Sequence, residues 1–342
     1  MDTRIQAFST AGCHLPQDVP ACRRAMVSVG PLCNYRCEFC YFKNDLKSTL
    51  PLDEIKRHID SLYDYGFREF DLTGGEPSIR KDFFDIIDYC AARGTVSCLS
   101  NGYKFSDIEF CKNAQQHGLN EVLLSIHGSN AAQHDRIVGH RGAFDRIIRA
   151  ARNCISLGYR VRINCTVHET NADTLDTEYV ELINSLGVFE VNFICVNYFS
   201  DNKDYKDQSL KIITDAIKRC IDKLTCKLIN VRYVPYCYMK GYEKHVTGYY
   251  QLIYDIYDWN LTSYSRRNSL PAHCDFIKDQ AEDAKSMRCN GFHKDDACRK
   301  CLWFFICDGI KDGMNAPYLP EAGKPITDVV HYRRDFFPRE DE

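Results

Sequence analysis

The sequence lacks the features that mark several classes of protein. No stretch approaches 18 uninterrupted apolar residues, so we expect no transmembrane helix and no membrane partner. The amino terminus, Met1-Asp-Thr-Arg-Ile-Gln, has no basic segment followed by an apolar one, which predicts a cytoplasmic rather than a secreted protein. There is no excess of basic residues either: the formal charge is −3 and the pI is about 6.4, so nucleic acid is not an expected partner.

Composition otherwise indicates an ordinary globular protein. The chain has 342 residues, of which 44% are hydrophobic and 27% charged, which is enough for one large domain or a medium domain with a satellite. Cysteine is the exception, with 19 residues. A long chain without a secretion signal has little use for so many disulfides, so the surplus is expected to be buried thiols or metal ligands.

Apolar runs and amphipathic helical patterns alternate from residue 25 to residue 234. Strands separated by helices predict parallel βαβ units. About seven such units suit an incomplete barrel better than a doubly wound sheet, which stays open as the alternative. The predicted strands are 25–29, 67–72, 95–99, 122–126, 161–167, 191–196 and 228–234, and the predicted helices are 52–65, 82–92, 107–117, 144–157, 174–186 and 208–224.

The character of the chain changes after Pro235. Tyrosines are frequent from 236 to 264, and cysteines come at short intervals from 273 to 307. The apolar content is too low for an independent core, and metal can replace a core in such a segment. We therefore divide the chain into an amino-terminal extension (1–24), a barrel (25–234), a cysteine-rich appendage (235–316) and a tail (317–342).

The first cysteine cluster directly follows the first predicted strand. Cys33, Cys37 and Cys40 lie at positions i, i+4 and i+7 of a loop, where three thiolates can converge on one point. Three ligands leave one iron of a four-iron cluster open, and that iron can bind a small molecule through nitrogen and oxygen. The alternatives are a chance grouping or a zinc site that lacks one ligand.

This CxxxCxxC pattern resembles the signature of the radical S-adenosylmethionine (radical SAM) superfamily, with Phe39 in the usual aromatic position and Tyr41 after the last cysteine. The resemblance implies an α/β fold, a partial (β/α)6-type TIM barrel. It also implies that the three cysteines hold a [4Fe–4S] cluster whose open iron chelates SAM. Reductive cleavage of SAM would then give a 5′-deoxyadenosyl radical that takes a hydrogen atom from the substrate.

Further segments extend the resemblance over residues 25–234. Each follows a predicted strand, in the order in which the family has them. In the family these positions lie near SAM, with His127 a departure from the usual Asp. The SAM-binding residues implied in this way are Gly74, Gly75, Glu76 and Pro77 (the GGEP motif), Asn101 (in Ser-Asn-Gly), Ser125 (in Ser-Ile-His-Gly) and Arg136 (in His-Asp-Arg), although capping a helix is an equal alternative for the last.

The second cysteine cluster contains Cys289, Cys298, Cys301 and Cys307. Four such residues can complete a tetrahedral zinc site or a closed [4Fe–4S] cluster, and spacing alone does not separate the two. The Cx2Cx5C core resembles the auxiliary-cluster region of the SPASM and Twitch radical SAM subfamilies, which favours iron–sulfur. The usual cysteine shortly after Cys307 is missing.

Cys237 and Cys274 lie where such families also draw auxiliary ligands. Six candidates exceed the needs of one cluster and fall short of two closed ones. We favour one closed cluster with two free cysteines. A cluster that uses Cys237 and keeps an open iron, or two partly ligated clusters, stay open.

The function expected from these motifs is that of a radical SAM enzyme with an auxiliary [4Fe–4S] cluster. We expect a small-molecule, natural-product substrate, because only 32 residues precede Cys33 and leave no room there for a winged-helix peptide-recognition domain. A peptide-modifying enzyme is the alternative, and a non-catalytic zinc or iron–sulfur sensor is a third. An electron donor such as flavodoxin or ferredoxin is the expected partner. No catalytic side chain is assigned. Cys98, Cys165 and Cys195 are candidates for donating a hydrogen atom to a substrate radical, but core packing is their expected role. His168 and Glu169 end the fifth predicted strand, where they could bind substrate or lie at the surface.

Overall fold

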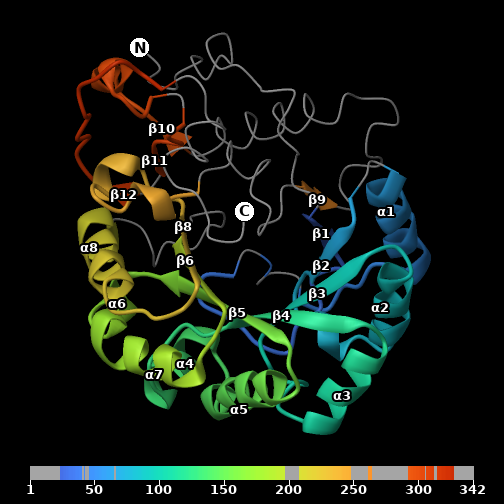
Figure 1. Cartoon of the computed structure of the whole chain (residues 1–342). Coiled ribbons are helices and arrows are strands. Elements are labelled where there is room, and N and C mark those ends of the chain that lie inside the picture. The colour runs from blue at the N-terminus through green and yellow to red at the C-terminus, as the bar shows by residue number, and fades with distance from the viewer. Residues whose placement is uncertain are drawn as a thin grey trace.

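The computed structural model describes residues 24–40, 42, 46–64, 67–196, 208–247, 261–263, 292–304, 306–311 and 314–326. Within these residues, one curled sheet forms the centre of the fold (Figure 1). Its eight strands are all parallel and follow the order β8-β6-β5-β4-β3-β2-β1-β9. The strands are β1 (Arg24–Ser28), β2 (Glu69–Thr73), β3 (Thr95–Ser100), β4 (Leu119–Ser125), β5 (Arg160–Val167), β6 (Glu190–Cys195), β8 (Leu228–Arg232) and the short β9 (Leu261–Ser263).

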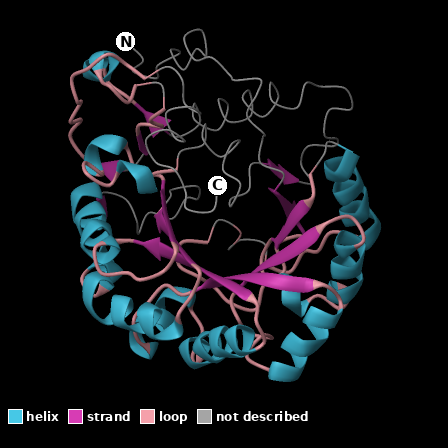
Figure 2. Ribbon diagram, viewed as in Figure 1, coloured by secondary structure: helices cyan, strands magenta, loops and turns pink. Residues whose placement is uncertain are grey.

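Helices cover the outer, convex face of the sheet, as Figure 2 shows. They are α1 (Leu52–Asp64), α2 (Phe83–Ala91), α3 (Ile108–Gln116), α4 (Ala131–Val138), α5 (Ala143–Ser156), α6 (Glu169–Ala172), α7 (Val180–Leu186) and α8 (Leu210–Ile221). The partial barrel predicted from the sequence is confirmed, and so are all seven predicted strands. The doubly wound alternative is wrong, because the strand order runs once across the sheet without reversal.

The structure differs from the predicted helices in three places. The short helix α6 was not predicted. The predicted helix 174–186 begins as a π-helical turn, Leu175–Tyr179, before it continues as α7. Helix α4 was not predicted, although its Asn130 side chain caps Gln133 N–H and Gly139 ends it with a φ of +63°. Its eight residues are too short to show clear helical periodicity, so the caps were the stronger signal.

Strand alternation separates an outer, apolar face from an inner, polar one. The outer face contains Cys98, Cys165 and Cys195, which are fully buried. Cys98 lies near Cys154 of α5, and Cys165 near Tyr179 under α7. The core role expected for these cysteines is therefore confirmed, and they do not point into the barrel.

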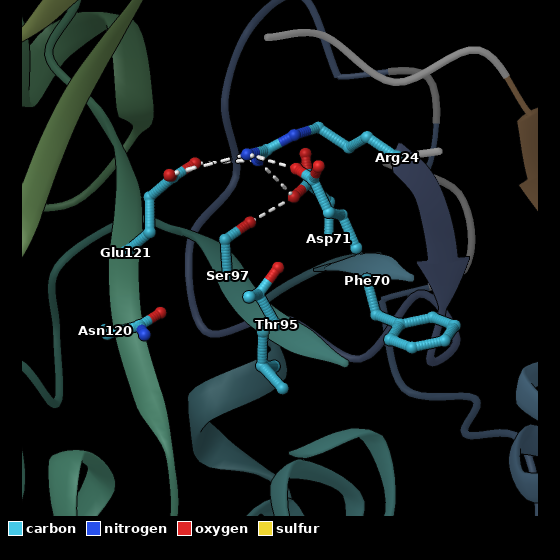
Figure 3. A pocket seen from close by; sticks show the side chains of 9 residues that line it. Arg24, Phe70, Asp71, Thr95, Ser97, Asn120 and Glu121 are labelled. Atoms are coloured by element: carbon cyan, nitrogen blue, oxygen red, sulfur yellow. Dashed lines mark hydrogen bonds and ion pairs between the residues drawn. The ribbon is translucent and has the colours of Figure 1, made fainter. Parts of the chain in front are cut away.

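Charged side chains fill the inner face at the amino-terminal ends of the strands (Figure 3). Arg24 donates to Asp71 at 2.8 Å and to Glu121 at 2.7 Å, and Arg162 lies 2.8 Å from Glu121. Ser97 donates a further hydrogen bond to Asp71. A small cavity lined by these groups opens here, at the end of the barrel opposite to the one where barrel enzymes place their chemistry. The network therefore serves to close the floor of the barrel.

The chain beyond β8 forms short elements. They are the turns Tyr236–Tyr238, Glu243–His245 and Asp296–Lys300, the antiparallel pair β10 (Phe292–His293) and β11 (Ile310–Lys311), and the pair of β7 (Gln208–Ser209) with β12 (Met314–Asn315). Tyr236 stacks on Trp303 with ring centroids 4.9 Å apart, which fastens this part to the end of β8. None of the described helices has the length and apolar content needed to cross a bilayer.

Candidate active site

The loop after β1 holds Cys33, Cys37 and Cys40 at the carboxyl end of the sheet. Backbone hydrogen bonds fix it against α4: Arg36 N–H donates to Val138 O at 3.1 Å and Glu38 N–H to Ile137 O at 2.9 Å. A turn from Cys37 O to Cys40 N–H, at 3.1 Å, closes the segment between the last two cysteines. The fold therefore holds the three thiols in one loop.

The thiols of this loop are protonated in the absence of a cluster. Burial raises the pKa of Cys33 to about 11, against the effect of the Tyr35 N–H, which donates to its sulfur at 3.4 Å. Burial also raises the pKa of Cys37, and the neighbouring Cys40 and Cys33 add to the rise. Thiols with raised pKa values ionise readily only when a bound cation, such as the iron of a [4Fe–4S] cluster, stabilises the thiolate.

The sulfur atoms do not yet converge. Among the described residues, no three His, Cys, Asp or Glu side chains form a closed metal site. A cluster therefore requires the cysteine side chains of the loop to turn toward one another, as expected for ligands that metal binding itself organises. The residues fit the group in type, number and placement. Tyr41 lies outside the described residues.

Gly74 and Gly75 permit close packing of two backbone segments. A Cβ on Gly74 would lie 2.3 Å from Gly30 O, and one on Gly75 would lie 2.3 Å from the carbonyl oxygens of Pro31 and Leu32. Gly75 N–H donates to Gly30 O at 3.0 Å. These glycines thus allow the end of β2 to pack closely against the segment directly before Cys33. This packing fixes the position of the cysteine loop relative to β2.

Glu76 joins the carboxyl ends of β2 and β3. Its side chain is buried and accepts hydrogen bonds from Ser78 N–H at 3.2 Å, from Ser100 Oγ at 2.8 Å and from Asn101 N–H at 2.6 Å. Burial raises the pKa of Glu76, while these donors lower it. Pro77 follows as the first residue of a short helical turn. The carboxylate thereby fixes the position of Asn101.

Asn101 in turn reaches the cysteine loop. Its Nδ2 donates to Asn34 Oδ1 at 2.9 Å and lies 4.0 Å from Cys33 Sγ. Glu76 of the GGEP segment and Asn101 of the Ser-Asn-Gly segment therefore lie close to Cys33 and are joined to its loop by hydrogen bonds. Ser125 ends β4 on the inner face, beside Asn164 of β5.

Arg136 lies at the edge of this site. Its side chain is 51% exposed and lies 4.0 Å from the Glu38 carboxylate. The cap of the segment comes from a neighbour: Asp135 accepts from the backbone N–H groups of Gly142 and Phe144 at 2.6 and 2.8 Å. The SAM-binding role of Arg136 stays a prediction.

A group of buried histidines follows β4 and β5. Their proximity was not predicted from the sequence. His127 is 3% exposed, and its ring meets Phe39 edge-on with centroids 4.8 Å apart. Its Nδ1 accepts from Thr166 N–H at 3.0 Å, so a neutral ring carries its proton on Nε2. Burial lowers the pKa of His127 far below its usual value, and His134 and His168 add to this. The site therefore presents a neutral imidazole where the family has a carboxylate.

An amide row lines the inner face of the strands on the far side of the barrel. Asn164, Asn192 and Asn230 are register partners on β5, β6 and β8, and Asn230 Nδ2 donates to Asn192 Oδ1 at 3.2 Å. Each asparagine alternates with apolar residues along its strand, so that it lies on the inner face. This alternation is visible in the sequence and could have predicted the row. A polar wall thus stands opposite the cysteine loop.

The second cysteine group comes together around the end of β8. Burial raises the pKa of Cys237 to about 12, and the nearby Cys307, Cys298 and Cys301 raise it further. The Cys307 sulfur accepts from Gly309 N–H at 3.3 Å and from Tyr236 N–H. The structure therefore places Cys237 near Cys298, Cys301 and Cys307, although the described side chains of this group do not form a closed metal site. Cys274 and Cys289 lie outside the described residues.

Comparisons with known proteins show which family the barrel resembles. The sequence profile of the radical SAM superfamily matches residues 27–176. These residues therefore match a radical SAM domain. The family uses a [4Fe–4S] cluster and SAM. The match covers the cysteine loop and the segments after β2, β3 and β4.

Relatives by sequence share part of their length with this chain. It is 30% identical to the Fe-coproporphyrin III synthase of Methanosarcina barkeri over 142 residues, which are 41% of the chain and 35% of that protein. It is 27% identical to a probable GTP 3′,8-cyclase of Saccharolobus solfataricus over 214 residues, 59% of the chain and 67% of the cyclase. The chain thus spans about a third of the first relative and two thirds of the second.

Solved structures agree on the fold. Streptococcus suis SuiB bound to S-adenosylmethionine matches with a TM-score of 0.61 and 14% identity, over 84% of this chain and 72% of SuiB. The structure of anSMEcpe with bound AdoMet and a Cp18Cys peptide matches with a TM-score of 0.54 and 17% identity, over 84% of this chain and 88% of the other. At such identities the agreement concerns the partial barrel alone.

Proposed function

We propose that this protein is a radical SAM enzyme that reductively cleaves SAM and abstracts a hydrogen atom from a small-molecule substrate. One observation carries the proposal: Cys33, Cys37 and Cys40 share one loop, and Glu76 and Asn101 tie that loop to the ends of β2 and β3. The cluster and SAM, when bound, would supply the 5′-deoxyadenosyl radical. The thiols would hold three irons, and Ser125 and the Gly74–Pro77 segment would hold the methionine part of SAM.

The carboxyl-end residues of β4 to β8 would then bind the substrate. His127 offers an N–H donor beside Phe39, and the Asn164–Asn192–Asn230 row offers amides. These groups suit a polar molecule that forms several hydrogen bonds. Burial lowers the pKa of His127 far below its usual value, so this ring stays neutral near neutral pH.

Residues 235–316 would hold an auxiliary [4Fe–4S] cluster through Cys298, Cys301 and Cys307. The position of Cys237 supports it as a further ligand. Cys289 stays a prediction for the same site. The buried Lys294 contributes positive charge near Cys298 and Cys307, which suits thiolate ligands. All 15 described cysteines are free thiols, and we place the protein in a reducing compartment, the cytoplasm.

A peptide substrate is the second candidate. SuiB has been solved bound to its precursor peptide SuiA, with a TM-score of 0.50 to this chain. The likeness concerns the barrel fold, and the chain's own polar inner wall suits a peptide amide as well as a polar metabolite.

Deuterium transfer separates the two substrate classes. Dithionite-reduced protein is incubated with SAM and either a deuterated metabolite extract or a deuterated peptide pool. We expect deuterium in 5′-deoxyadenosine from the metabolite extract, because the radical takes its hydrogen atom from the bound substrate. Deuterium from the peptide pool alone would replace the small-molecule assignment by the peptide one. A pool without SAM is the control.

A further inference from the structure

The outer side of the cysteine loop packs on an aromatic group that reaches the surface. Cys33 and Cys37 contact a small buried cluster of Tyr35, Val138 and Ala143. Tyr35, 2% exposed, stacks on the partly exposed His140 with centroids 4.4 Å apart and an interplanar angle of 22°. This stack forms a short contact path from the cysteines to the surface at the turn between α4 and α5.

Basic side chains surround this point. Arg36, Lys104 and Arg141 are exposed, and the Arg146 guanidinium lies 4.9 Å from the centre of the Tyr103 ring, which packs edge-on against Tyr35. We call these four residues, Arg36, Lys104, Arg141 and Arg146, the basic rim.

The charge of the basic rim stands out against that of the whole chain. Residues 131–152 contain five arginines and two aspartates, while the chain as a whole carries a formal charge of −3. Asp135 is engaged by backbone N–H groups. Glu38, the exposed Asp145 and the exposed Asp107, whose N–H donates to Lys104 O at 3.0 Å, are further carboxylates nearby. The rim is therefore a local positive surface on an acidic protein.

We propose that the basic rim docks an acidic one-electron carrier protein of the flavodoxin type. The inference rests on the proposed function, since the rim is useful for this purpose only if the loop holds a cluster. The carrier would lose one electron and the cluster would gain it, with no bond made or broken and no proton moved. The Tyr35–His140 stack puts the loop close to this surface.

Position and charge favour a carrier over a substrate at this surface. Arg141 and Arg146 belong to the α4–α5 segment, which covers the outer side of the sheet (Figure 1), and Arg36 and Lys104 lie in the loops after β1 and β3. The polar inner wall, by contrast, is formed by β5, β6 and β8. Opposite charges raise the rate of encounter between proteins, and this effect weakens as salt screens it.

Charge reversal on the rim provides the test. In the reconstituted holoenzyme, Lys104→Glu/Arg141→Glu is compared with the matched control Arg57→Glu/Lys211→Glu on α1 and α8, which changes the net charge equally. A purified acidic flavodoxin is the probe, and we measure its Kd by calorimetry and the rate at which its hydroquinone reduces the cluster. At about 50 mM salt we expect the rim variant to show about a tenfold higher Kd and slower reduction.

Reduction by dithionite, and the 5′-deoxyadenosine that follows, should stay at the wild-type level in both variants. Wild-type Kd and rates in the rim variant, or equal losses in the control variant, would overturn the proposal. A loss that persists with dithionite would also overturn it and assign the rim to another polyanion or to substrate. A wild-type protein that binds flavodoxin but makes no 5′-deoxyadenosine would instead contradict the proposed function.

Discussion

Replacing Cys33, Cys37 and Cys40 together by alanine is expected to lower the iron content of the anaerobically reconstituted protein from about eight to about four per chain, since a cubane cluster holds about four irons. The reason is that the loop after β1 and the cysteines after β8 are separate sites. Cys37 packs against Tyr35 and α4, whereas Cys237 and Cys307 lie near the Tyr236–Trp303 stack. Iron and acid-labile sulfide per chain are the measured quantities.

Two further variants give this experiment its control and its counterpart. Cys98→Ala removes a buried thiol that faces the helices, and it should leave about eight irons. Cys298→Ala/Cys301→Ala/Cys307→Ala should leave about four, now in the first loop. Loss of all iron from the Cys33/Cys37/Cys40 variant would mean that the cysteines after β8 hold zinc or no metal.

Asp71→Asn is expected to destabilise the barrel by about 3 kcal/mol, because it leaves two buried arginines with one carboxylate fewer. Asp71 accepts from Arg24 at 2.8 Å and from Arg162 at 3.3 Å, and all three side chains are buried. The exposed pair of Glu109 and Lys112, 2.7 Å apart, offers the matched control. Glu109→Gln should change the free energy of unfolding by less than about 1 kcal/mol. Urea unfolding of the reconstituted protein measures both.

The contribution of Asp71 depends on pH in a definite direction. Burial would raise its pKa, but Arg24 and Arg162 outweigh burial and hold the pKa below its usual value. A carboxyl group with a depressed pKa stabilises the fold above its unfolded pKa, about 3.9, and loses this effect as the pH falls through the folded value.

The difference between wild type and Asp71→Asn should thus be constant from about pH 5 to 8 and shrink in stronger acid. Burial raises the pKa of Glu69, which acts in the opposite direction, so the comparison uses the two proteins rather than the wild-type curve alone. A difference that grows in acid would contradict this account of the floor network.

Much of this arrangement could be predicted from the sequence because it depends on order along the chain. The seven strands appear as apolar runs, and parallel strands bring their carboxyl ends to one edge. The family resemblance assigned Cys33, Glu76, Asn101 and Ser125 to one site, which agrees with this rule, and the structure links the first three through hydrogen bonds.

The rest depends on contacts between distant segments. The role of Gly75 was assigned to ligand approach, whereas its hydrogen atoms make room for the carbonyl groups of Pro31 and Leu32. The proximity of His127 to Phe39 and of Cys237 to Cys307 follows from how loops fold back over the sheet. The buried Arg24 network joins residues up to 138 positions apart, from Arg24 to Arg162. No local sequence pattern predicts ion pairs between such distant residues.

Formation of 5′-deoxyadenosine from SAM tests the central claim most directly. The reconstituted protein is reduced with dithionite, incubated with SAM and assayed by chromatography, beside the variant that lacks Cys33, Cys37 and Cys40. We expect 5′-deoxyadenosine from the wild type and none from the variant, because the loop after β1 is the proposed site of the SAM-binding cluster. A wild-type protein that holds about four irons at this loop and leaves SAM intact would contradict the account.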